Sequence, residues 1–167
     1  MPDTIGSQGA ADLCKVCTIW YTFVMGITDE LRINTRPDVV WSLTIDVENW
    51  PKLTPTITSV ERLDSGPLRI GSTARIKQPG QRPAVWTVTK LEPERRFEWE
   101  TTVAGTRMVG THDIRPEGDA TINTLGVELA GPFAWALRLL AGRSIRKAIT
   151  TENLGFQEAA ERQPSVD

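Results

Sequence analysis

The 167-residue sequence predicts one α+β domain in which an antiparallel sheet of about seven strands covers a long C-terminal helix. Three features of the sequence support this architecture. Short segments between residues 28 and 129 alternate apolar and polar side chains, as half-buried strands do. Residues 36–55 contain prolines placed where short helices begin and end. Residues 131–161 change to an apolar spacing of three and four, which is typical of a packed helix.

The first part of the domain is predicted to contain one strand and two short helices. Residues 28–35 alternate and predict the strand. Pro37 suits the first turn of a helix over residues 36–43, where an N–H group would have no helical partner. A second short helix is expected over residues 46–55, where prolines end it.

Six more strands follow, separated by turns rich in glycine and proline. Their spacing suits antiparallel hairpins with one buried face and one solvated face. The predicted strands are residues 57–63, 72–78, 84–93, 97–103, 106–114 and 121–129.

The last segment, residues 131–161, is long enough to cross the whole domain, ~45 Å at 1.5 Å per residue. A helix is only ~10 Å wide, whereas a sheet of six or seven strands is ~30 Å wide. One helix therefore cannot fill the concave side of the sheet. Either large side chains fill the gap or a cavity remains, and apolar cavities with a few polar groups are small-molecule sites.

Composition narrows the possible partners. The formal charge is −2, with 19 basic and 21 acidic residues spread along the chain, and no basic block indicates a nucleic-acid or anionic-membrane surface. The apolar run at residues 16–27 is shorter than the ~20 residues of a membrane span and lacks the features of a signal peptide. We therefore expect no nucleic-acid partner, no stable membrane insertion and a cytoplasmic location.

Residues 1–24 are interpreted as an N-terminal extension, either disordered or the product of a mis-assigned start, and residues 25–163 as the domain. Cys14 and Cys17 form a C-x-x-C pair, but a four-ligand zinc site needs two more ligands and the chain has one histidine. We therefore predict reduced thiols, no metal site and no cofactor.

Several segments resemble one family, the polyketide cyclase/dehydrase and lipid-transport branch of the START-like (SRPBCC) superfamily. They are residues 36–55, 66–100, 110–123 and 130–137. The resemblance spans about residues 28–161 and implies the helix-grip fold, in which a curved antiparallel sheet wraps around a long C-terminal helix. The superfamily includes aromatase/cyclases, lipid carriers and plant hormone receptors, so the resemblance specifies the fold better than the activity.

His112 is the only histidine, and its place in the strand pattern makes it a candidate site residue. It shares a face with Met108 and Ile114, so it should point toward the interior. An imidazole there can act as a general acid or base, bond a ligand, or be a buried structural residue. We favour ligand contact without catalysis, or a structural role.

Glu152 interrupts the apolar line of the terminal helix. A buried, unpaired carboxylate costs several kcal/mol, so it should pair with a polar group or lie at the cavity mouth. His112 and Arg138 are candidate partners. Alternatively, the helix bends near Gly142 and Glu152 is exposed.

The predicted cavity indicates binding of a hydrophobic or aromatic small molecule by a monomer or homodimer, and the resemblance implies a lipid-like or polyketide-like ligand. One alternative is a polyketide cyclase or dehydratase with His112 and Glu152 as catalytic acid and base. Another is a helper or interaction protein with an incidental cavity. The predicted ligand contacts are Trp50, Ile76, Gln78, Trp86, Trp99, Met108, His112, Leu137 and Ile145.

Overall fold

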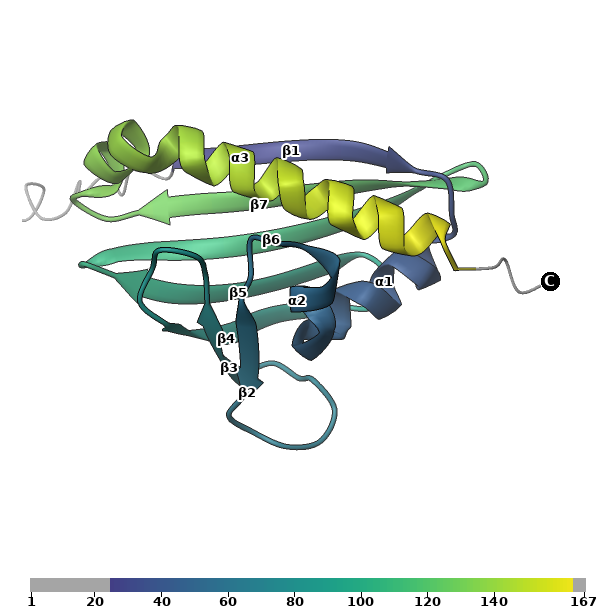
Figure 1. The fold of residues 1–167 in the computed structure, drawn as a ribbon, viewed down its shortest axis with the longest axis horizontal. Coiled ribbons are helices and arrows are strands. Elements are labelled where there is room, and N and C mark those ends of the chain that lie inside the picture. Colours follow the sequence, from purple (N-terminus) through teal and green to yellow (C-terminus); the bar gives the residue numbers. More distant parts are fainter. Residues whose placement is uncertain (1–24, 164–167) are drawn as a thin grey trace, which may run out of the picture.

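A computed structural model describes residues 25–163 and contains one seven-stranded antiparallel sheet (Figure 1). The strand order is β1-β7-β6-β5-β4-β3-β2. The strands are β1 (Met25–Ile33), β2 (Ser59–Arg62), β3 (Thr73–Lys77), β4 (Ala84–Glu92), β5 (Arg96–Val103), β6 (Thr106–Glu117) and β7 (Ala120–Ala130). The predicted helix-grip α+β fold is therefore confirmed.

The helices also follow the predicted order. Between β1 and β2 lie α1 (Pro37–Ile45), the short 3-10 helix η1 (Val47–Asn49) and α2 (Trp50–Leu53). The C-terminal helix α3 spans Ala134–Glu161. Among the described residues, no helix is long and apolar enough to cross a membrane.

The first strand is longer than its sequence pattern predicts. β1 begins at Met25, three residues before the alternating pattern, because β7 offers a partner along its whole length. Met25 pairs with Leu129 at one end of this ladder, and Ile33 pairs with Thr121 at the other. Cross-strand hydrogen bonds extend a strand wherever a neighbour continues, which a local pattern does not record.

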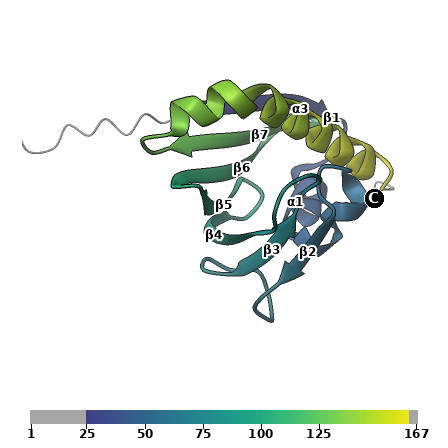
Figure 2. The ribbon, with the colours of Figure 1, turned by 60° about the vertical axis from the view of Figure 1, so that its left-hand side comes forward.

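The long helix lies over one side of the sheet rather than over its middle. α3 packs mainly against β1 and β7, while β2 to β5 curl away from it (Figure 2). Its C-terminal half closes the core, where Phe156 contacts the buried Trp50.

Two close contacts hold α3 in this position. The side-chain amide of Asn153, fully buried, donates to Asp29 Oδ2 at 2.9 Å and accepts from Asn123 Nδ2 at 2.9 Å. At Gly155, an added Cβ would lie 2.2 Å from the carbonyl oxygen of Leu53. Glycine is therefore required where the end of α2 meets α3, since any larger residue would strike backbone.

Candidate ligand-binding cavity

A cavity of about 270 Å³ lies between the inner face of the sheet and the N-terminal part of α3. Trp86 of β4 and Trp99 of β5 form one aromatic wall, with ring centroids 5.3 Å apart. Trp50 of α2 packs edge-on against Trp99 at 4.8 Å. Tryptophan combines a large apolar surface with one N–H donor, which suits the wall of a small-molecule site.

Gly110 of β6 leaves the space in which the indole of Trp99 lies. A Cβ at this position would sit 2.6 Å from Trp99 Nε1 and 2.9 Å from Trp99 Cδ1. The glycine is directly opposite Trp99 in the β5–β6 ladder. A larger residue at position 110 would therefore displace the ring that forms the cavity wall.

His112 lies at the inner end of the cavity and is enclosed by aromatic rings. The rings of Trp50, Phe97 and Phe156 have centroids 4.9, 5.7 and 5.4 Å from the imidazole. Burial disfavours the charged form and lowers the pKa of His112 to about 3. The imidazole is therefore neutral at pH 7, and its Nδ1 is buried with no hydrogen-bond partner among the described residues.

Glu152 of α3 lies on the opposite wall, with its side chain 13% exposed. Burial raises the pKa of Glu152 to about 7, although a side-chain hydrogen bond with Thr56 acts in the opposite direction. Glu152 Oε1 is 3.7 Å from His112 Nε2. That distance is too long for a hydrogen bond, and a neutral imidazole does not form an ion pair.

The structure therefore settles where Glu152 lies. It lines the cavity beside His112 rather than facing solvent. The other candidate partner was wrong, because Arg138 lies outside this cavity and its Nη1 donates to the carbonyl of Gly26 in β1 at 2.7 Å.

All sequence-predicted site residues line this cavity, although their roles in binding or catalysis stay predictions. Those residues are Trp50, Ile76, Gln78, Trp86, Trp99, Met108, His112, Leu137, Ile145 and Glu152. No cluster of His, Cys, Asp or Glu within residues 25–163 could hold a metal ion. Cys14 and Cys17 lie outside the described residues.

Several cavity residues were not predicted. Ser144 and Ala148 neighbour Ile145 on α3, and Leu125 lies on β7. Their helical spacing and strand parity could have identified them. Ile57, by contrast, begins the predicted strand of residues 57–63 but lies just before β2, so strand parity does not place it in the cavity.

A family profile described as polyketide cyclase/dehydrase and lipid transport matches residues 26–161. No curated protein sequence matches the chain significantly. The profile therefore covers nearly the whole part of the chain that the structure describes.

Solved structures share the fold at low sequence identity. Truncated norcoclaurine synthase from Thalictrum flavum has a TM-score of 0.67 at 14% identity, covering 86% of this chain and 97% of that one. TTHA0849 from Thermus thermophilus has a TM-score of 0.64 at 21% identity, covering 81% and 97%. The Zhui aromatase/cyclase from Streptomyces sp. R1128 has a TM-score of 0.61 at 15% identity, covering 83% and 92%.

Proposed function

Because the chain belongs to the polyketide cyclase/dehydrase and lipid-transport family of SRPBCC proteins, we propose that it binds a hydrophobic or aromatic small molecule in the cavity beneath α3. The observation that supports this most is the unfilled space itself, bounded by Trp50, Trp86 and Trp99. Its volume of about 270 Å³ is just below the ~300–1,000 Å³ common for ligand pockets. A compact ring system suits it better than a long acyl chain.

The polar groups of the cavity specify what such a ligand should carry. His112 is neutral at pH 7, and a neutral imidazole has one donor and one acceptor nitrogen. Glu152 lies across from it, and with a pKa of about 7 it can donate or accept a hydrogen bond near neutral pH. An apolar ring bearing one hydroxyl or carbonyl group therefore complements the site better than a charged ligand.

Two matched probes test this proposal. 2-Naphthol and naphthalene have the same ring system and differ by one hydroxyl group, and their binding can be followed by fluorescence. We expect the protein to bind 2-naphthol more tightly, with a difference that disappears in His112→Phe. Loss of one hydrogen bond of ~0.5–1.5 kcal/mol corresponds to binding that is about two- to tenfold weaker, and His112→Ala should show a loss at the upper end of this range while it folds normally.

A second pair of variants tests the location. Ala148→Phe places a ring inside the cavity, whereas Leu154→Phe places the same ring on the exposed side of α3. The first should abolish binding of both probes and the second should leave it unchanged. If neither probe binds the unmodified protein, or if Ala148→Phe binds normally, the proposal is wrong.

The enzyme alternative is favoured by one specific observation. A neutral imidazole and a carboxyl group with a pKa of about 7 stand 3.7 Å apart in one cavity. Two titratable groups whose environments push their pKa values apart can divide base and acid roles, and here burial sets the pKa of His112 to about 3 and that of Glu152 to about 7. This alternative would be supported if the protein cyclised or dehydrated a poly-β-ketone and if His112→Ala and Glu152→Gln abolished that reaction without loss of binding.

The third alternative, an interaction protein with an incidental cavity, would need a filled interior, and the open cavity weighs against it. The cytoplasmic location and the monomeric or homodimeric state stay predictions. So does the absence of a nucleic-acid partner.

A further inference from the structure

The N-terminal half of α3 and the residue before it carry large apolar side chains that face solvent. Leu139 and Leu140 are 77% and 84% exposed, and Phe133 and Trp135 are each more than half exposed. Soluble proteins leave single apolar residues exposed, but a cluster of four within eight residues indicates a contact surface.

The same turns of the helix are strongly basic. Arg138, Arg143, Arg146 and Lys147 lie on α3, and no acidic residue occurs between Ala134 and Glu152. This segment carries four positive charges in a chain whose net charge is −2. The sequence showed no basic block because apolar residues separate these cations.

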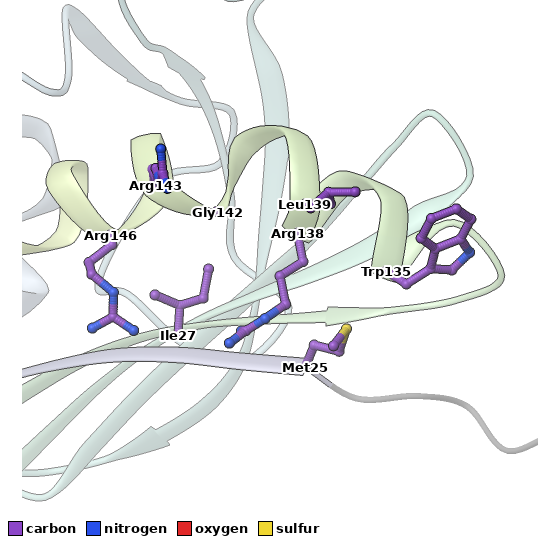
Figure 3. A pocket seen from close by; sticks show the side chains of 8 residues that line it. All are labelled: Met25, Ile27, Trp135, Arg138, Leu139, Gly142, Arg143 and Arg146. Atoms are coloured by element: carbon purple, nitrogen blue, oxygen red, sulfur yellow. The ribbon is translucent and has the colours of Figure 1, made fainter.

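A groove of about 520 Å³ runs between these turns and the edge strand β1. Arg138 and Arg146 point toward β1, where they donate to the carbonyl oxygens of Gly26 at 2.7 Å and Thr28 at 3.4 Å (Figure 3). Arg143 points away from β1 in the same view. Arginine side chains therefore point to both sides of this part of α3.

We propose that this surface docks peripherally on an anionic lipid membrane. We call it the α3 face; it consists of the apolar residues Phe133, Trp135, Leu139 and Leu140 and the cations Arg138, Arg143, Arg146 and Lys147. Amphipathic helices with aromatic and leucine side chains beside Lys and Arg lie in the interface of anionic bilayers. Tryptophan in particular resides at the headgroup level.

Charge complementarity favours a membrane over the other possible occupants. A symmetric dimer would place the α3 face of one copy against the same face of the other, so four cations would meet four cations. A nucleic acid would satisfy the cations but leave Leu139 and Leu140 without an apolar partner. The proposal goes beyond the proposed ligand-binding function and does not depend on it.

The first experiment is co-sedimentation of the full chain with vesicles. We expect binding to phosphatidylcholine vesicles that contain phosphatidylglycerol, weakening as salt increases, and much weaker binding to pure phosphatidylcholine. Each cation near an anionic surface strengthens binding by about fivefold, so Arg143→Gln with Lys147→Gln should weaken it by about 25-fold. Leu139→Ser with Leu140→Ser should weaken it at least tenfold, because the inserted apolar area is lost.

Arg69 and Ile70 provide a matched control. They are an exposed cation and an exposed apolar residue in the loop between β2 and β3, away from α3 (Figure 1). Arg69→Gln with Ile70→Ser makes the same types of substitution and should leave vesicle binding unchanged. If this control weakens binding as much as the α3 variants do, binding is non-specific and the proposal is wrong.

The second experiment locates the contact. Trp135 is the only exposed tryptophan within residues 25–163, so brominated phosphatidylglycerol should quench part of the fluorescence of a Trp20→Phe protein, in which every remaining tryptophan is described. Trp135→Phe should remove most of that quenching while retaining vesicle binding. Quenching that persists in Trp135→Phe would contradict docking through the α3 face.

Two further results would overturn the proposal. One is the absence of binding to phosphatidylglycerol vesicles at low salt. The other is a stable dimer in sedimentation equilibrium that Leu139→Ser with Leu140→Ser dissociates, since a second copy would then cover the surface.

Discussion

Glu152→Gln should stabilise the protein at alkaline pH and have little effect at acidic pH. In the folded protein the pKa of Glu152 is raised from 4.5 to about 7 because the carboxylate is buried. Above pH 7 the group is ionised in both the folded and unfolded states, and only the folded state bears the cost of burying the charge. That cost decreases as the pH falls through 7, when the folded carboxyl group takes up a proton.

The magnitude follows from the two pKa values. At about 1.4 kcal/mol per pH unit, the shift from 4.5 to about 7 destabilises the folded protein by about 3 kcal/mol at pH 8.5. At pH 5 the same pKa shift destabilises the folded protein by less than ~1 kcal/mol. The stability gained by Glu152→Gln should therefore be about 2.5 kcal/mol larger at pH 8.5, or roughly 7 °C in Tm. A neutral amide has no such dependence.

Urea and thermal denaturation of both proteins at the two pH values, followed by circular dichroism, measure this difference. Burial also lowers the pKa of His112, so the folded protein loses stability as the pH falls below 6.5. This loss is the same in the unmodified protein and in Glu152→Gln, so it cancels in the difference between them. Glu158→Gln, on the same helix with its side chain 73% exposed, is the matched control. If Glu152→Gln and Glu158→Gln respond equally to pH, Glu152 is not a buried acid and the account of the cavity is wrong.

Other variants test how α3 is held. Gly155→Ala should destabilise the folded protein by about 2 kcal/mol, because the clash with the Leu53 carbonyl outweighs the ~1 kcal/mol that alanine gains over glycine in a helix. Gly142→Ala has room for the added methyl group and should stabilise the protein by ~0.5–1 kcal/mol. Equal thermal shifts of the two would contradict the close approach. Asn153→Ala should cost about 3 kcal/mol in urea denaturation, since it leaves buried polar partners unpaired, and a loss under ~0.5 kcal/mol would refute this. Deleting residues 1–24 should preserve the cooperative thermal transition; its loss would place that segment in the core.

The order of the elements could be predicted because it depends on local periodicity. A period of two marks the strands and one of 3.6 marks α3, and each period also specifies which side chains share a face. Strand parity therefore pointed His112 inward, and helical spacing aligned Glu152 with the apolar line. The structure places both in the wall of the same cavity. The sheet is also much wider than the single helix that covers it, and this difference in width was enough to predict a cavity between them.

Local patterns do not contain the distances between faces that meet only in the folded chain. Trp50 lies 4.9 Å from His112 although 62 positions separate them, and Arg138 bonds to Gly26 instead of approaching Glu152. The pKa values of the two cavity groups depend on how completely the surrounding elements exclude water. The sequence alone determined the architecture and which residues face inward. Long-range packing and desolvation arise only when the elements assemble, and they determine the partners of these residues, the size of the cavity and the protonation states.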